Sequence, residues 1–499
     1  MSLPEQIPIL VIIIPLISAL LVAVLGRINA SLGWFVAVAA TFLSFLASCA
    51  LLASVAQSGP ISYWLGGWEP PWGIEYVVDY LSGLVLVVVS FIALMVALYA
   101  RRSVESEIPE SKTPFFYAAY MLFVTGLMGM TITGDIFNLY VFIEITSLSA
   151  YSLIAMGKKR DALIASFNYL ILGTIAGTFI LIGVGYLYMV TGTLNMADLR
   201  EQLPLLYDST AVRTAFAFFT VGLSLKLALF PLHVWLPNAY TYAPSAVSSL
   251  VAATGTKVGA YVLLRIMFTV FGVDFDIEAV PVTRILIFLS SVAIIAGSVL
   301  AIAQTNIKRM LAYSSVGQIG YIVLGAALVN EMAMTGSLIH IFNHAIMKCS
   351  LFLVAGAVVY RTGIVDISGY KGMGRKMPWS MAAFTVGGLS MIGVPLTVGF
   401  VSKWYLALGA IEAGMWFIVP VILASSLLTA VYFWRVIEWI YFHRAPEDLA
   451  SVEHGEAPFG MVAPTLVLAA MCVFFGVAAY LPVSIAARAA SLLLGLEVN

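Results

Sequence analysis

Residues 220–260 read TVGLSLKLALFPLHVWLPNAYTYAPSAVSSLVAATGTKVGA, and this segment indicates the class of fold. It is apolar enough for a lipid bilayer, yet it carries Lys226, His233, Lys257 and three prolines. A lysine at the centre of a membrane helix costs roughly 2.5–3.5 kcal/mol on insertion scales. A proline opens the hydrogen-bond ladder, which is tolerated where helices line a polar cavity. The segment therefore predicts a path for ions, and the remaining chain is its scaffold.

The composition is that of a polytopic membrane protein. Of the 499 residues, 62% are hydrophobic and 10% are charged, whereas an average soluble domain is about 25% charged. The mean hydropathy is +1.03, and a net charge of −1 gives no reason to expect a nucleic-acid partner. Cys49, Cys349 and Cys472 lie far apart and form neither a disulfide framework nor a metal motif. Glu5 precedes the first apolar run, so we expect a retained span and no cleaved signal.

The apolar runs predict an all-α integral membrane protein with fourteen spans of about 20 residues or more. Loop charges support this number, because alternate loops hold 14 of the 24 Lys and Arg residues. Under the positive-inside rule both termini lie on the non-cytoplasmic side of a prokaryotic cell membrane. The predicted spans are 7–26, 32–55, 80–100, 114–132, 136–156, 162–191, 211–236, 244–270, 282–304, 310–329, 333–360, 379–411, 415–442 and 460–486.

A weak internal repeat predicts how the spans are organised. FPLHVWLP (230–237) is similar to VPLTVGFV (394–401), and each interrupts a long apolar span. Broken helices at matching positions of two halves are typical of transporters with inverted repeats, although Pro-Leu could also recur by chance. Five spans per repeat, an odd number, would invert the copies in the membrane. The predicted divisions are helices 1–3 at 1–110, a first repeat (helices 4–8, helix 7 broken) at 111–270, a second repeat (helices 9–13, helix 12 broken) at 271–445, and a loop with helix 14 at 446–499.

Glu144 lies in the middle of the fifth predicted span, and Lys226 is its expected partner. Alone, a buried carboxylate favours its neutral form, whereas beside a lysine both groups can stay charged. At about 6 Å and an effective dielectric near 20, Coulomb's law gives roughly 3 kcal/mol. Moving Glu144 would switch Lys226 between holding and releasing a proton. The plainer alternative is a fixed buried ion pair that joins two helices.

Lys257 is about thirteen residues from either end of its predicted span. A buried lysine without a carboxylate can accept and release protons near neutral pH. Snorkelling to the interface is the alternative, and it suits lysines near span ends. Nearby Ser245 and Ser249 could hold water or fill gaps between helices.

His340, His344 and Lys348 are spaced by four residues, which stacks them on one helix face. Imidazole titrates near neutral pH, so the row suits a proton relay. Satisfied core histidines are one alternative, and zinc is another, although no adjacent residue supplies further ligands. Lys403 follows the second break and is the expected terminal group, but it does not align with Lys226.

At these residues the chain resembles the antiporter-like subunits of complex I, membrane-bound hydrogenases and Mrp-type multisubunit cation/proton antiporters. The similarity runs from GGWEPPWGIEYVVDYLSG (66–83) to about residue 445, and includes LKLALFPLHVWLPNAYTYAPS, HIFNH and GFVSK. It implies fourteen helices around two inverted five-helix repeats, with charged residues across the midplane. The implied relay consists of Glu144 and Lys226 as the switching pair, Lys257 as the connection, His340 and His344 at the centre, and Lys403 in the exit half. Secondary candidates are His233, Lys348, Ser245, Ser249 and Asp79.

The sequence around Glu144 and the N-terminal tryptophan loop is most similar to the D-type subunit of Mrp-type Na+/H+ antiporters. The first hypothesis is thus a proton-translocating subunit of such a complex. Its expected partners are a homologous antiporter-like subunit, small hydrophobic subunits, the bilayer, H+ and Na+. The alternative is the same relay in a redox-driven complex, namely a hydrogenase, a sulfur-reducing complex or complex I. In neither case do we expect this chain to be an enzyme, because it carries no haem, flavin, iron–sulfur or metal motif. A stand-alone antiporter is the third hypothesis.

Overall fold

Long apolar runs become long helices, because a backbone in a bilayer must satisfy its hydrogen bonds within each segment. The computed structural model describes residues 3–278, 280–444 and 455–496, and within them twelve helices are long and apolar enough to cross a membrane. They correspond to twelve of the fourteen predicted spans. These helices are α1 (Ile7–Ile28), α2 (Ala30–Ser58), α3 (Tyr80–Glu107), α4 (Thr113–Ile132), α5 (Ile136–Ala155), α6 (Arg160–Thr191), α10 (Ser245–Leu264, continued by a π-helical segment Arg265–Phe271), α12 (Val282–Ile302), α13 (Ile307–Ala327), α14 (Glu331–Thr362), α18 (Ile418–Phe442) and α20 (Phe459–Val477).

The two remaining predicted spans are each divided in two. The first consists of α8 (Thr210–Lys226) and α9 (Trp235–Tyr242), and the second of α16 (Pro378–Ile392) and α17 (Val398–Glu412). Each break contains one of the proline motifs, as the sequence predicts. Two non-glycine residues in the breaks have positive φ angles, Ala228 at 59° and Leu396 at 69°. Such angles are uncommon outside glycine and cannot continue a helix.

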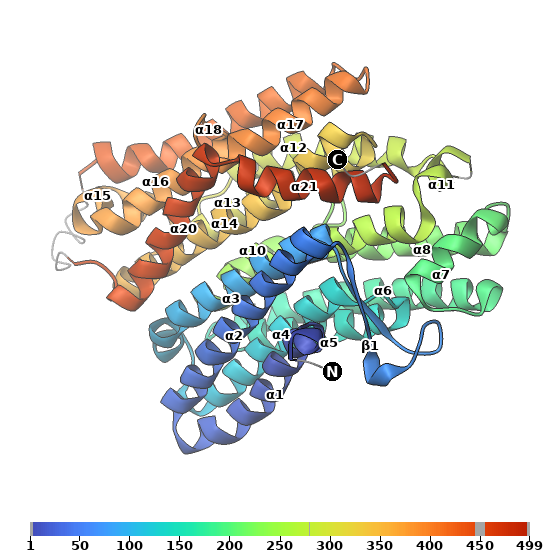
Figure 1. Cartoon of the computed structure of the whole chain (residues 1–499). Helices are drawn as coiled ribbons and strands as arrows, with labels where there is room; N and C mark the ends of the chain where they lie inside the picture. The colour runs from blue at the N-terminus through green and yellow to red at the C-terminus, as the bar shows by residue number, and fades with distance from the viewer. Residues whose placement is uncertain (1–2, 279, 445–454, 497–499) are drawn as a thin grey trace.

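The prediction of one continuous span at 460–486 is wrong. The chain forms α20, turns at residues 478–479 and continues as α21 (Tyr480–Leu493), which runs at an angle to α20 in Figure 1. Pro482 explains the turn, because its ring would clash with the carbonyl of Ala478 in a continuous helix. The loop predicted at the start of the C-terminal division falls within 445–454, outside the described residues.

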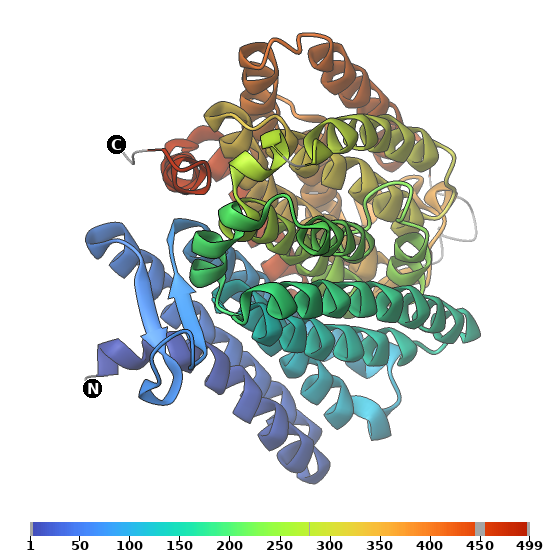
Figure 2. The same cartoon turned by 90° about the vertical axis from the view of Figure 1, so that its right-hand side faces the viewer.

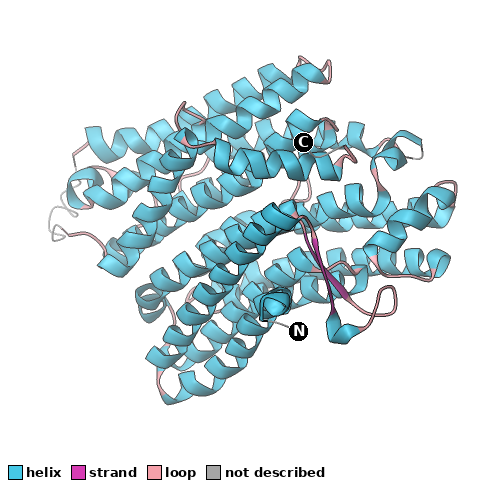
Figure 3. Cartoon of the chain, in the orientation of Figure 1, coloured by secondary structure: helices cyan, strands magenta, loops and turns pink. Residues whose placement is uncertain are grey.

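Short elements connect the long helices, and Figure 3 shows how little of the chain is strand. A two-stranded antiparallel hairpin, β1 (Ile61–Trp64) and β2 (Glu75–Val78), pairs Ile61 with Val78 and Trp64 with Glu75. It lies near the N-terminus at the surface in Figure 2, and the all-α prediction does not include it. The short helices are α7 (Met196–Gln202), α11 (Val273–Glu278) and α15 (Met373–Lys376).

The two halves of the chain meet along α10 and α14. In Figure 1 the first half, blue to green, occupies the lower part of the bundle, and the second half, yellow to red, the upper part. Helices α10 and α14 pack against each other, and both are buried along almost their whole membrane stretch. Polar residues on these two helices are therefore shielded from lipid by protein on every side.

Candidate functional site

The first helix break brings Lys226 and Glu144 together, as the sequence predicts. The Lys226 Nζ lies 3.9 Å from Glu144 Oε1 and donates a hydrogen bond of 2.6 Å to Ser147 Oγ. Glu144 and Ser147 lie three residues apart on α5, so one helix face supplies both partners. Lys226 is the last residue of α8, and a helix C-terminus carries partial negative charge that stabilises a cation.

The Glu144 side chain is the more exposed member of the pair, at 30% against 10% for Lys226. Its carboxylate lies against Gly177 of α6, where a Cβ atom would collide with Glu144 Oε1. Helix α6 therefore leaves room for the carboxylate only because it has no side chain at this position. A small cavity of about 30 Å³ adjoins Lys226 and is lined in part by Gly255 and Gly259 of α10. It is large enough for water, and the two glycines flank Lys257 in sequence.

Lys257 is buried on α10, with 2% of its surface exposed. Its Nζ donates hydrogen bonds to the Ala252 carbonyl and, at 3.4 Å, to Thr256 Oγ1. No carboxylate of the described chain forms an ion pair with it. The titratable groups close enough to interact electrostatically with Lys257 include His340, His344 and Lys348, which all lie on α14. Lys257 thus lies on α10, the helix that packs against α14.

The row on α14 is fully buried. The rings of His340 and His344 are nearly parallel, with centroids 5.8 Å apart. Lys348 Nζ donates a 2.6 Å hydrogen bond to the Leu311 carbonyl of α13 and another to Ser314 Oγ. Both ring nitrogens of His344 and Nε2 of His340 have no hydrogen-bond partner among the described residues. Buried polar atoms of this kind are normally paired with protein or ordered water, so the row suits a water-assisted proton path.

The second helix break is joined to this row by two contacts. His340 Nδ1 lies 2.8 Å from Ser402 Oγ on α17, and the ring of Tyr321 lies 5.5 Å from that of His340. Lys403 Nζ lies 5.2 Å from the centroid of the same tyrosine ring. The ammonium donates hydrogen bonds to the carbonyls of Met391 (3.1 Å) and Ile392 (2.9 Å) and to Ser426 Oγ (3.0 Å).

The secondary candidates lie outside this row, except Lys348. Ser245 donates two hydrogen bonds to Glu107, and Ser249 donates to the Ser245 carbonyl, so the structure does not bring either serine to Lys257. His233 packs between the rings of Phe230 and Tyr313 in the first break.

Asp79 begins α3 and forms a 2.5 Å ion pair with Arg265 at the start of the π-helical segment. Sequence reasoning places Arg265 within a span but does not reveal this partner. It also misses three residues around the row, Ser147, Tyr321 and Ser402. Hydroxyl groups are frequent in these spans, so no signal in the sequence separates these three from the rest.

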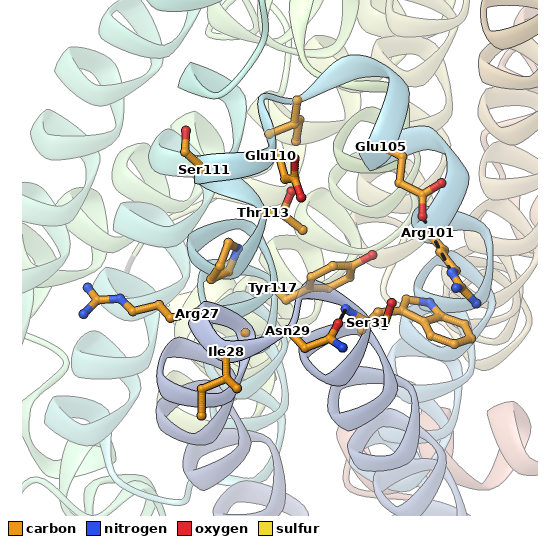
Figure 4. Close-up of a pocket in the computed structure, with 14 residues that line it drawn as sticks. Arg27, Ile28, Asn29, Ser31, Arg101, Glu105, Glu110, Ser111, Thr113 and Tyr117 are labelled. Carbon is orange, nitrogen blue, oxygen red and sulfur yellow. Dashed lines mark hydrogen bonds and ion pairs between the residues drawn. The ribbon is translucent and has the colours of Figure 1, made fainter.

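A larger cavity lies elsewhere in the described chain. It measures about 930 Å³ and is formed where the α1–α2 turn meets the α3–α4 connection. Figure 4 shows Arg101 and Glu105 on one side of it and Ser111 and Glu110 above Tyr117. None of the residues of the row lines this cavity.

Comparisons with known proteins cover nearly the whole chain. Residues 133–429 match the family described as NADH:quinone oxidoreductase/Mrp antiporter, TM. This range contains all the relay candidates from Glu144 to Lys403. The chain is 46% identical to the N-type subunit of the NADH-quinone oxidoreductase of Desulforudis audaxviator over 482 residues, covering 94% of this chain and 95% of that one. It is 32% identical to the D-type subunit of the Na(+)/H(+) antiporter of Alkalihalophilus pseudofirmus, covering 87% and 86%.

Two solved structures share the fold. One is a chain of the membrane-bound sulfane sulfur reductase, an archaeal respiratory membrane complex, with a TM-score of 0.89, 33% identity and 98% coverage of both chains. The other is a chain of the Mrp complex from Dietzia sp. DQ12-45-1b, with a TM-score of 0.89, 26% identity and coverage of 99% of this chain and 98% of that one.

Proposed function

Because this chain belongs to the NADH:quinone oxidoreductase/Mrp antiporter membrane family, we propose that it is a proton-translocating subunit of a redox-driven membrane complex. The choice of a redox-driven complex rests on 46% identity to an NADH-quinone oxidoreductase subunit and 33% identity to a chain of a sulfur-reducing complex. This reverses the order of the two hypotheses drawn from the sequence. The redox centres would lie in partner subunits, because no group of three or more metal-binding side chains occurs in the described part of this chain.

The observation that supports the proposal is a set of buried lysines and histidines that lies between the two helix breaks. Lys226 is charged while Glu144 lies beside it. When the carboxylate moves away, the ammonium loses its opposite charge and releases a proton to water in the adjoining cavity. Lys257 accepts that proton on α10. This step depends on two features of the structure, the 3.9 Å ion pair between Lys226 and Glu144 and the cavity beside Lys226.

The second part of the path runs along α14. Protons pass from Lys257 to His344 and His340, because an imidazole can accept a proton on one nitrogen and release one from the other. Ser402 and Tyr321 connect His340 to Lys403 at the second break. Lys403 holds the proton among neutral dipoles until the exit opens. The two breaks, one in each predicted repeat, support the division into 111–270 and 271–445.

The experiment that tests the redox assignment is gentle detergent extraction of native membranes followed by mass spectrometry of the co-purifying subunits. We expect nickel–iron, or flavin and iron–sulfur, subunits. Recovery of small hydrophobic subunits without any cofactor-binding partner would contradict this assignment. It would support the second candidate, an Mrp-type Na+/H+ antiporter, which the 32% identity to the D-type antiporter subunit favours.

A further inference from the structure

We propose that the relay takes up protons through a separate cavity, in which Glu107 and Lys308 bind the proton and pass it on. This inference rests on the proposed function and adds to it a place where protons enter from the aqueous phase. The cavity measures about 220 Å³ and lies where the end of α3, the α5–α6 turn, the α9–α10 junction and the start of α13 meet. Its polar lining includes Ser106, Glu107, Lys158, Lys159, Asn306 and Lys308, together with Thr241 and Tyr242.

Glu107 is held rigidly at the wall of this cavity. Its carboxylate accepts hydrogen bonds from the Ser245 backbone N–H at 2.9 Å and from Ser245 Oγ at 3.1 Å, both at the first residue of α10. Ser103 Oγ donates a third at 2.7 Å. A carboxylate at a helix N-terminus is stabilised by the helix dipole, so Glu107 places a fixed negative charge at the opening.

Lys308 lies deeper, with 4% of its surface exposed. Its Nζ donates a 3.3 Å hydrogen bond to the Ala243 carbonyl, and the charges of Glu107 and Lys159 act on it. Lys308 is the second residue of α13. A cation in the first turn of a helix is opposed by the helix dipole, and a buried cation also loses hydration. The hydrogen bond to Ala243, the C-cap of α9, compensates part of this cost at the end of that helix.

The helix that carries Lys308 leads directly to the row. Leu311 and Ser314 follow Lys308 by one and two turns, roughly 5 and 9 Å along α13. The carbonyl of Leu311 and the hydroxyl of Ser314 are the hydrogen-bond acceptors of Lys348. Lys348 lies four residues from His344 on the same face of α14. A proton that reaches Lys308 is thus one helix turn from the groups that hold Lys348.

The charge of the opening agrees with this role. The cavity combines one carboxylate with three lysines, and it lies at the ends of spans whose loops carry the excess of basic residues. By the positive-inside rule this end faces the cytoplasm. The carboxylate of Glu107 can accept a proton from the aqueous phase, and the exposed Lys158 and Lys159 lie beside it in the cavity wall.

The first test labels the cavity in the assembled complex. Ser106→Cys is placed in the cavity wall, and Ser111→Cys, which lines the large cavity of Figure 4, is the matched control. A positively charged, membrane-impermeant methanethiosulfonate reagent is added to vesicles at the cytoplasmic face, and proton transport is measured. The native cysteines remain, because Cys349 and Cys472 are buried; the unsubstituted complex with reagent controls for Cys49.

We expect labelled Ser106→Cys to lose proton transport about tenfold and to regain it after reduction, whereas labelled Ser111→Cys transports normally. Complete labelling of Ser106→Cys with unchanged transport would overturn the proposal, and so would failure of the reagent to reach it from the cytoplasmic face. A complex that transports no protons before labelling would refute the proposed function instead, and the labelling itself would still report access to the cavity.

The second test separates a proton carrier from a fixed charge. Arginine keeps the positive charge but does not release its proton in proteins. We therefore expect both Lys308→Gln and Lys308→Arg to slow transport about tenfold in fully assembled complexes, while Lys371→Gln, whose lysine lies over Trp439 outside this cavity, has little effect. Normal transport by Lys308→Arg would show that only the charge is needed, which contradicts the proposal.

Discussion

Both helix breaks hold a lysine ammonium at the end of the first half-helix, but different residues surround the two lysines. In the first, Lys226 is itself the last residue of α8, and its partners are the Glu144 carboxylate and the Ser147 hydroxyl. In the second, Lys403 comes from α17 and reaches back to the carbonyls of the last two residues of α16. Both arrangements hold an ammonium at the C-terminal end of the first half-helix, where free carbonyls favour a cation.

The difference lies in the partner. Lys226 has a full negative charge beside it, on another helix, whereas the partners of Lys403 among the described residues are neutral carbonyls, a hydroxyl and the face of Tyr321. A charged partner can be moved away, and its removal changes the proton affinity of the lysine sharply. The carbonyl dipoles around Lys403 are fixed, so the proton affinity of this lysine changes little. In the proposed mechanism, the first break therefore acts as a switch and the second as a holding site. The sequence alignment of the two proline motifs does not superimpose Lys226 and Lys403, yet their positions at the helix ends correspond.

Among variants at the two breaks, the largest effect should come from removing the charged partner at the first break. Glu144→Gln keeps the size of the side chain but leaves Lys226 without its carboxylate, so we expect proton transport to fall roughly 100-fold. The matched control is Glu438→Gln, since Glu438 is 46% exposed on α18 and pairs with His443. Proton uptake into vesicles with equal amounts of assembled complex measures both. Equal losses in the two variants would mean that the special role of Glu144 is wrong.

A smaller effect, divided into two parts, is expected at the second break. Lys403→Met removes both the proton carrier and the donor to the carbonyls of Met391 and Ile392, so it should lower transport about tenfold and also the yield of assembled complex. Lys403→Arg should restore assembly but not transport, because arginine retains its proton. Native gel electrophoresis and vesicle assays separate the two readouts. Full transport by the arginine variant would remove Lys403 from the relay.

The smallest effect is expected from filling the space beside the Glu144 carboxylate. Gly177→Ala places a methyl group against the Glu144 carboxylate and should displace it from Lys226, lowering transport severalfold while the helix folds normally. Gly185→Ala on the same helix is the control, because nothing lies within 4 Å of its added Cβ. If both alanine variants transport equally well, the position of the carboxylate is less critical than the comparison of the breaks requires.

Much of the fold could be predicted because each signal is local. Span length follows from bilayer thickness, and both breaks follow from prolines that cannot continue a helix. The same rule would have divided the last span at Pro482, but α1 and α20 continue through Pro15 and Pro464, so a proline alone does not decide where a span breaks. The buried relay candidates stood out because charged residues are rare in apolar runs.

What the sequence could not supply depends on packing. The end of α8 at Lys226, the contact of Glu144 with Gly177 and the hydrogen bond between His340 and Ser402 join distant segments. Ser245 and Ser249 are candidates because they lie near Lys257 in sequence, but their hydroxyls serve Glu107 and the helix backbone. The closeness of two residues along a helix does not reveal which hydroxyl faces the row.

One buried path joins the two breaks in this proposal, and Lys257 is the residue on which that path depends. The most direct measurement is proton translocation by vesicles that contain fully assembled Lys257→Met complex, beside Lys371→Met, whose lysine stacks on Trp439 outside the row. We expect that Lys257→Met assembles but translocates no protons, while Lys371→Met is normal. Undiminished translocation by assembled Lys257→Met complex would contradict the buried path.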